Sequence, residues 1–175
     1  MALTNRAGTP PDLTFRHLLA KSGLSSGEVE LDYRFPGHVG LAEAVAAGET
    51  DLCILAEPYI TRSIGANPEI VPLLDLSLEW NRVEGMMPAE TAFLCRGDLA
   101  GERGQEVAEM VASLAESASL ALKHPEYGVD AHRLHFNVVP AARAEGEIRS
   151  YLEIFFRNAP ASIGGRIPDE KFLCQ

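Results

Sequence analysis

The chain has 175 residues, 46% of them hydrophobic, and a formal net charge of −10. That length and apolar content are sufficient for one packed domain or for two small lobes. The acidic balance argues against nucleic acid as a partner, because phosphate binding needs clustered Lys and Arg. No apolar run has the length required to span a bilayer.

The first third of the chain alternates strand and helix patterns. Residues 2–5 form a short strand candidate, and Thr9 is suited to cap a helix that ends at Gly23. Residues 29–35 then alternate apolar and polar side chains, which is typical of an edge strand with one covered face. A further helix is expected between Gly37 and Gly48.

A buried strand is predicted next. Residues 52–56 are an unbroken apolar run that ends at Glu57, as in strands covered on both faces of a parallel sheet. A short helix at 59–64 and further strand candidates at 70–74 and 91–95 follow. The order βαβαβ predicts a parallel sheet with right-handed crossovers.

The pattern becomes helical after Gly97. Residues 105–123 and 146–157 each carry an apolar stripe at helical spacing, whereas 160–175 are rich in Gly and Pro and have no period. These helices would expose apolar stripes in a monomer. We therefore expect the region 105–157 to fold back onto the first domain or to pair with a second copy.

The cysteines do not indicate a metal site. Cys53, Cys95 and Cys174 have no spacing suited to zinc, and no metal or cofactor is predicted. Cys53 and Cys95 fall in apolar runs and are expected to be small core residues, with an isolated disulfide bridge as an alternative. No signal peptide is visible at the amino terminus, so a cytoplasmic protein is expected if Met1 is the natural start.

Three loops that precede helices would meet at the carboxyl edge of the predicted sheet. Their backbone N–H groups and positive dipole ends favour an anionic or carbonyl-bearing ligand group. The predicted ligand-binding residues are Thr9, Phe35, Pro36, Gly37, His38, Glu57, Pro58 and Tyr59. The rings would supply stacking surface and Glu57 would accept a hydrogen bond. Taken singly, each loop is more simply an ordinary helix start, at which a carboxylate suits the dipole, and it is the convergence of all three that favours binding.

Evidence for catalysis is thin. The chain contains no nucleophile elbow, phosphate-binding loop or HExxH motif. His38 and Glu57 could in principle form an acid–base pair across the mouth of the site. A hydrogen bond from one of them to a ligand requires a less specific geometry. No catalytic residue and no enzyme activity are predicted.

Four segments follow one another in the order and spacing of a known family. They are Gly8-Thr9-Pro10-Pro11-Asp12 with Phe15-Arg16-His17-Leu18-Leu19, Ala47-Gly48-Glu49-Thr50-Asp51 with Leu55-Ala56-Glu57-Pro58-Tyr59, Met87-Pro88-Ala89-Glu90-Thr91-Ala92, and residues 162–172. Together they resemble the substrate-binding proteins of ABC importers. The branch they resemble is related to thiamine-precursor, alkanesulfonate and nitrate binders.

This resemblance implies an α/β fold of the type II periplasmic-binding-protein class, with a parallel or mixed sheet flanked by helices and a helical C-terminal segment. Residues 1–96 would form the second-lobe-like ligand-binding domain, and residues 97–175 would complete the family's first lobe. The amino-terminal part of that first lobe has no counterpart here. The predicted loops would then line one wall of a cleft, with Trp80 and Met87 as weaker candidates.

The function implied by the resemblance is non-catalytic solute binding, by a binding protein or the C-terminal part of one. The expected ligand is a small polar, heteroaromatic or anionic metabolite, the expected partner an ABC transporter permease, and the expected location periplasmic or extracellular. Two alternatives are a thiamine-pyrimidine-precursor synthase-like enzyme and a cytoplasmic effector or interaction module. The enzyme is associated with a cysteine-rich motif, and clustered cysteines are absent from this sequence.

Overall fold

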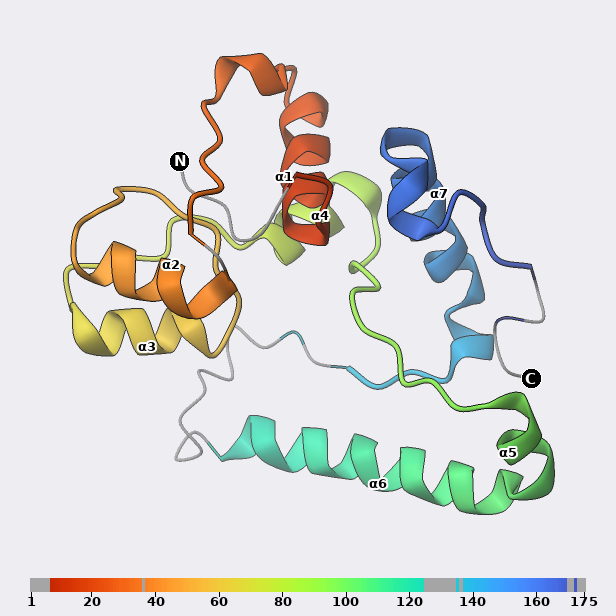
Figure 1. The fold of residues 1–175 in the computed structure, drawn as a ribbon. Coiled ribbons are helices and arrows are strands. Elements are labelled where there is room, and N and C mark those ends of the chain that lie inside the picture. Colours follow the sequence, from red (N-terminus) through yellow and green to blue (C-terminus); the bar gives the residue numbers. More distant parts are fainter. Residues whose placement is uncertain (1–6, 36, 125–134, 136, 170–171, 173–175) are drawn as a thin grey trace.

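The computed structural model of the chain describes residues 7–35, 37–124, 135, 137–169 and 172. Its elements are the helices α1 (Pro10–Lys21), α2 (Gly37–Ala46), α3 (Tyr59–Ala66), α4 (Leu76–Glu84), α5 (Gly97–Glu102), α6 (Gly104–Lys123) and α7 (Glu145–Asn158), with the 3-10 turns η1 (Ser26–Glu28), η3 (Ala141–Arg143) and η4 (Pro160–Ile163) (Figure 1). None of the described helices combines the length and apolarity that a membrane-spanning helix needs.

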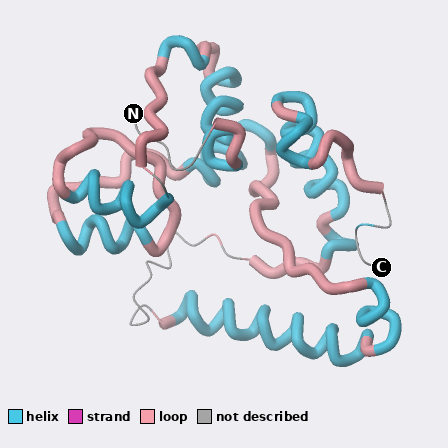
Figure 2. Tube along the Cα trace, in the orientation of Figure 1, coloured by secondary structure: helices cyan, strands magenta, loops and turns pink. Residues whose placement is uncertain are grey.

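The prediction of an α/β fold with a parallel or mixed sheet is wrong. Within the described residues, helices are joined by loops, and only the single bridge positions Asp32 and Cys53 have strand character (Figure 2). A type II binding-protein lobe built on a sheet is therefore not supported. The strand candidate at 2–5 lies outside the described residues.

Local contacts explain part of this outcome. In the 29–35 segment, the Tyr33 hydroxyl donates to Asp12 on α1 (2.7 Å) and the Arg34 N–H donates to the Asp32 carboxylate (3.0 Å), so these groups are engaged outside any strand ladder. In the 70–74 segment, Pro72 has no N–H to contribute to a ladder. Apart from the single bridge positions Asp32 and Cys53, the alternating and apolar segments form extended chain without strand pairing.

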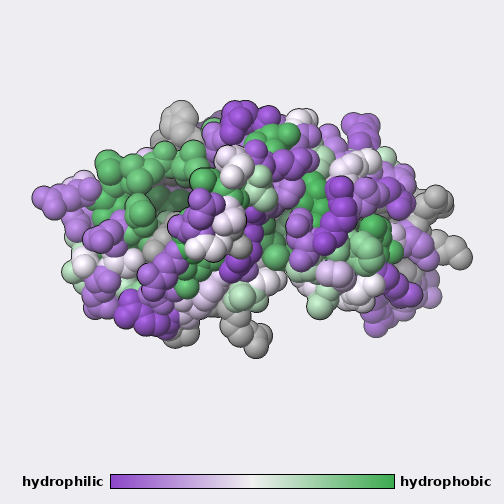
Figure 3. All heavy atoms as spheres, turned by 90° about the horizontal axis from the view of Figure 1, so that it is seen from above, coloured by the Kyte–Doolittle hydropathy of each residue, from purple (hydrophilic) through white to green (hydrophobic). Residues whose placement is uncertain are grey.

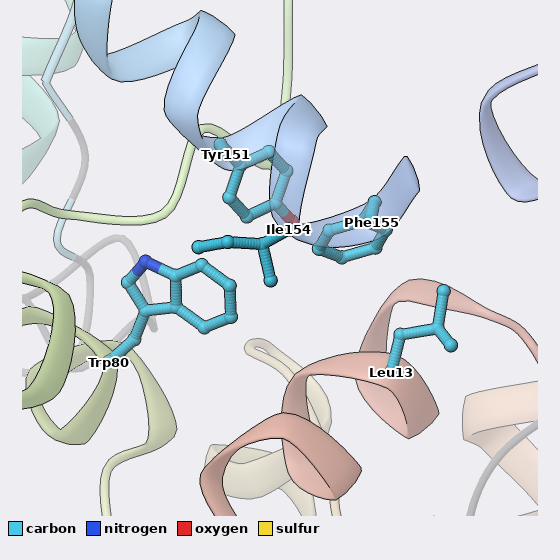
Figure 4. Close-up of a cluster of buried hydrophobic side chains, with 5 residues drawn as sticks. All are labelled: Leu13, Trp80, Tyr151, Ile154 and Phe155. Carbon is cyan, nitrogen blue, oxygen red and sulfur yellow. The ribbon is translucent and has the colours of Figure 1, made fainter. Parts of the chain in front are cut away.

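The core lies where α1, α4 and α7 meet. It consists of five buried side chains, Leu13, Trp80, Tyr151, Ile154 and Phe155 (Figure 4). Trp80 is fully buried, with its ring 5.3 Å from that of Tyr151 in an edge-on arrangement. Burying each such side chain contributes roughly 1.5–3 kcal/mol, so this cluster accounts for much of the attachment of α7 to α1 and α4.

Helix α4 has clear boundaries. The Asp75 carboxylate accepts hydrogen bonds from the N–H groups of Ser77 and Leu78 at its start. Gly85 ends it with φ of 74°, in the left-handed region that glycine adopts without strain. These caps fix the direction in which α4 presents Trp80 to the core.

Two other parts of the fold have different surroundings. Helices α2 and α3 pack against each other, whereas α6, among the labelled elements, contacts α5 alone. Apolar side chains are exposed on the segments that flank α2 and α3, namely Leu52, Val71, Leu73 and Leu74. Figure 3 shows apolar surface on the left of its view, the side on which α2 and α3 lie in Figure 1. The predicted boundary between the ligand-binding domain, residues 1–96, and the C-terminal segment, residues 97–175, stays a prediction.

Candidate functional site

Helices α2 and α3 lie side by side and run in the same direction. Three contacts at successive turns join them: the His38 ring stacks on the Tyr59 ring, the Ser63 hydroxyl lies 3.3 Å from the Ala42 carbonyl oxygen, and the Asn67 amide donates to the Ala46 carbonyl at 3.2 Å. The two hydrogen-bonded pairs are each 21 residues apart in sequence, and the stacked pair has the same offset. A constant offset of this sign requires parallel helices, so their N-termini are adjacent.

The ring stack marks the shared N-terminal end of this helix pair. The His38 and Tyr59 ring centroids are 5.1 Å apart and the ring planes differ by 16°. Tyr59 is the first residue of α3, and His38 follows Gly37, the first residue of α2. Two sets of first-turn N–H groups and two positive dipole ends are thus brought together. The sequence predicted that three loops would meet at the edge of a sheet; two of them lie together here, without a sheet.

Glu57 serves the start of α3. Its Oε2 accepts a hydrogen bond from the Thr61 N–H at 3.1 Å, so the carboxylate lies at the positive end of that helix. This is the helix-start role that the sequence left open beside ligand binding. Nearby, the His38 Nδ1 and Thr61 Oγ1 atoms are buried and have no hydrogen-bond partner among the described residues.

The remaining predicted residues are more dispersed. Thr9 precedes α1 in extended conformation, and its buried hydroxyl makes no cap hydrogen bond. Within the described part of the chain, no hydrogen bond or ring contact joins Thr9 to the α2–α3 pair. The Arg34 guanidinium lies 5.4 Å from the centre of the Phe35 ring. Pro58 is exposed, and Pro36 lies outside the described residues.

The two weaker candidates have different positions. Trp80 belongs to the core and has no exposed surface, so it does not line a cleft wall. Met87 is 37% exposed. A tryptophan between polar residues gave no sequence signal of burial, because α4 itself was not predicted.

Asp12 is the centre of a polar cluster that sequence reasoning missed. Its side chain is almost fully buried, and it accepts hydrogen bonds from the Gly8 N–H (2.7 Å), Arg16 Nε (2.6 Å) and the Tyr33 hydroxyl (2.7 Å). Hydrogen bonds with Tyr33 and Asp12 raise the pKa of Arg16. Because each oxygen of the carboxylate is engaged, the cluster clamps the 29–35 segment onto α1. The spacing of Asp12 and Arg16 was the available signal.

A second polar cluster surrounds the start of α4. The Asp75 Oδ2 lies 2.7 Å from His135 Nε2. Desolvation, followed by the charge of Asp75, raises the pKa of the Glu90 carboxyl. Burial, followed by the charge of Glu90, raises the pKa of Tyr151. No group of three or more His, Cys, Asp or Glu among the described residues is arranged to hold a metal ion.

A hollow lined by described residues lies elsewhere. It has a volume of about 550 Å³ and is lined by Glu30, Leu31, Asp32, Arg34, Glu49, Thr50, Asp51 and Leu52. None of the predicted ligand-binding residues lines it. One of its carboxylates, Asp32, is paired with Arg34 at 2.7 Å.

The cysteines have unequal environments. Cys53 and Cys95 are both partly buried and unbridged. Burial raises the pKa of the Cys53 thiol, which favours the unreactive protonated form. The Cys95 thiol lies 3.2 Å from the Arg96 carbonyl oxygen. Within the described residues, no hydrogen bond joins either cysteine to the His38–Tyr59 stack.

Comparison with known proteins identifies the fold. No family model matches the chain, and no curated protein matches it. A crystal structure of an ABC transporter from Parabacteroides distasonis matches with a TM-score of 0.80 and 20% sequence identity, covering 99% of this chain and 66% of that one. The chain therefore spans about two thirds of the length of that protein. At this identity the likeness shows the fold alone: the chain has a fold distantly related to that of an ABC transporter protein.

Proposed function

We propose that this chain is the solute-binding part of an ABC importer and binds a small polar, heteroaromatic or anionic metabolite without chemical conversion. The fold likeness to an ABC transporter protein supports the class. The observation that carries the proposal is the parallel α2–α3 pair, whose N-termini meet at the His38–Tyr59 stack. The proposed site is this stack together with the first turn of α2.

Electrostatics favours an anionic group there. Each helix N-terminus carries the equivalent of about half a positive charge, and two parallel helices place these charges together. Glu57 already accepts from the Thr61 N–H at the start of α3. The ligand anion is therefore assigned to the first turn of α2, which begins at Gly37. Helix N-termini are general anion sites because their N–H groups lack intrahelical partners.

The side chains at this end suit a ring-bearing ligand. The His38 Nδ1 has no hydrogen-bond partner among the described residues, so a ligand donor or acceptor would satisfy it. The rings of His38 and Tyr59 stack on each other, so a ligand ring could extend the stack on the outer face of one of them. Such surface stacks against a flat heteroaromatic ring.

The partner and compartment follow from the same proposal. A binding component of an importer delivers solute to a membrane permease, so the permease is the proposed partner. It also works outside the cytoplasmic membrane, which makes the proposed location periplasmic or extracellular. Fractionation of cells that produce the tagged natural protein, followed by immunoblotting, tests the location. Recovery in the cytoplasmic fraction alone would contradict it.

Thermal unfolding in the presence of metabolites tests the binding. A ligand that binds only the folded state raises the melting temperature with saturation. Carboxylates, sulfonates and nitrogen heterocycles would be screened against the chain and its His38→Ala variant, with His135→Ala as the matched control. We expect one ligand to bind the chain and the control equally and the His38→Ala variant at least tenfold more weakly.

Mass spectrometry of the recovered ligand separates binding from catalysis. An unchanged mass after prolonged incubation is the expected result, and conversion of the ligand would contradict a non-catalytic role. Equal binding by the His38→Ala variant would move the site away from α2. Absence of stabilisation by any compound on the natural full-length protein would overturn the proposal.

A further inference from the structure

The Asp75 carboxylate joins two parts of the chain that are far apart in sequence. Its Oδ1 accepts hydrogen bonds from the N–H groups of Ser77 (2.9 Å) and Leu78 (3.1 Å), so this oxygen caps the start of α4. Its Oδ2 lies 2.7 Å from Nε2 of His135, 60 residues further along the chain. The two oxygens therefore have separate roles. The second oxygen holds the segment that leads to η3 and α7 against the start of α4.

Glu90 is the third titratable group of this cluster. It lies in the loop after α4, next to Ala89, which packs against the core around Trp80. Desolvation, followed by the charge of Asp75, raises the pKa of the Glu90 carboxyl. Two carboxyl groups thus act on each other here. Of the two, Asp75 alone has a basic partner within the described part of the chain.

The neighbouring polar groups on α7 and α4 leave this balance of charges unchanged. Tyr151 of α7 faces Glu90 and stays protonated at neutral pH, because burial, followed by the charge of Glu90, raises the pKa of its hydroxyl. On α4 itself, the Glu79 carboxylate is paired with Arg82 at 2.7 Å. Among the described residues, the titratable side chains that act on Asp75 are therefore His135 and Glu90.

A change of pH alters the charges of these groups in a common direction. Imidazole ordinarily carries its positive charge below about pH 6.5. Desolvation alone would raise the pKa of Asp75, but hydrogen bonds from His135 and from the N–H groups of α4 outweigh it and hold the pKa below the ordinary value of 3.8. In mild acid a charged histidine therefore faces a carboxylate, while Glu90 takes up its proton. Above neutrality the histidine is neutral and a charged Glu90 repels Asp75.

We propose that Asp75, His135 and Glu90 form a pH-sensitive latch, which fastens the segment before η3 to the start of α4 in mild acid and weakens as the pH rises past neutrality. Glu90 has a raised pKa, so its contribution to stability is present below its unfolded-state pKa and is lost as the pH rises through its folded-state pKa. Asp75 has a lowered pKa, so its contribution is lost only as the pH falls through its folded-state pKa. The latch is strongest between these two ranges. It is independent of ligand binding at α2 and α3.

A double-mutant cycle at two pH values tests the latch. His135→Gln, Asp75→Asn and the double variant are unfolded in urea at about pH 5.5 and about pH 8, on either side of the ordinary pKa of histidine. Asn caps a helix as well as Asp does, so Asp75→Asn removes the charge and keeps the cap of α4. We expect the coupling between the two side chains, expressed as a factor in the unfolding equilibrium constant, to be roughly threefold larger at the lower pH. Coupling that is equal at the two pH values, or larger at the higher one, would overturn the proposal.

Neutralisation of Glu90 tests the third group of the latch. Glu90→Gln should reduce the loss of stability between the two pH values, because no charge then develops beside Asp75. Glu153→Gln makes the same change in net charge at an exposed position on α7 and should leave that loss unchanged. Circular dichroism at both pH values confirms that each variant keeps its helix content. Equal effects of Glu90→Gln and Glu153→Gln would overturn the assignment of Glu90 to the latch.

Discussion

The Tyr33 hydroxyl donates a 2.7 Å hydrogen bond to Oδ1 of Asp12, whose carboxylate is only 1% exposed. This contact joins the loop that follows η1 to the first turn of α1. It lies within the loop that was expected to be an edge strand. The segment is held by a hydrogen bond to a buried carboxylate and not by pairing with another strand.

Replacement of Tyr33 by Phe tests the strength of this clamp. Loss of a hydrogen bond to a buried carboxylate costs roughly 1–3 kcal/mol, because Asp12 keeps its charge and loses a donor. We expect Tyr33→Phe to lower the free energy of unfolding by that amount in urea titrations. Tyr59→Phe is the matched control and should change stability by less than about 0.5 kcal/mol. Equal effects of the two variants would contradict a specific role for Tyr33.

The core is tested through Trp80. Truncation of a buried Trp to Ala costs roughly 3–5 kcal/mol, since it removes apolar surface and leaves a cavity. We expect Trp80→Ala to lose α7 packing and most of the stability. Leu94→Ala, at a position 70% exposed, should have little effect. Because the chain contains one tryptophan, its fluorescence in the unmodified protein reports this core alone.

The stabilisation that the Glu84 carboxylate provides is expected to be lost in acid. Partial burial alone would raise the pKa of Glu84, but hydrogen bonds from Lys21 and His17 outweigh it and hold the pKa below the ordinary value of 4.5. A carboxyl with a depressed pKa stabilises the fold above the unfolded-state pKa, and this contribution is lost as the pH falls through the folded-state pKa. We expect Glu84→Gln to be less stable than the unmodified chain at pH 7. The difference should vanish toward pH 3, and a pH-independent difference would refute the assignment.

The ionisation of Glu90 is expected to change the stability with pH in the opposite direction. Reduced hydration and the charge of Asp75 raise the pKa of this carboxyl. Stability linked to Glu90 is therefore greatest below its unfolded-state pKa and falls as the pH rises through the folded-state pKa. We expect Glu90→Gln to be more stable than the unmodified chain at pH 7 and equal to it near pH 4. Thermal melts at both values give the comparison, in which a destabilised variant at pH 7 would contradict the prediction.

The helices were the most predictable part of the fold. The apolar stripes of α1, α6 and α7 gave these helices to within a few residues, because an amphipathic face is a strong periodic signal. Helix α4 was not predicted although Asp75 and Gly85 are suitable caps, because the apolar residues at 70–74 just before it favoured a strand, with Pro72 interpreted as an edge or a bulge. The predicted sheet was wrong because the alternation of apolar and polar residues indicates which side chains are covered. It does not indicate whether the backbone pairs with a neighbouring strand.

The candidate site was predictable only in part. Two of the three loops predicted to meet, those before α2 and α3, lie together at the His38–Tyr59 stack, but the sheet edge on which the prediction placed them is absent from the described residues. The helix-start role of Glu57 was foreseen as an alternative, and its bond to Thr61 N–H shows that role. The Asp12 cluster and the polar group around Asp75 depend on contacts between residues far apart in the chain, such as Asp75 with His135. Single-sequence patterns carry no information about such pairings.

The register between α2 and α3 makes the pair a single mechanical unit. Asn67 donates to the Ala46 carbonyl at the C-terminal end, and the His38–Tyr59 stack closes the N-terminal end. The two ends are about 12 Å apart along the helices. Local opening of α3 would also remove contacts from α2, so we expect the two helices to exchange their amide hydrogens as one cooperative segment.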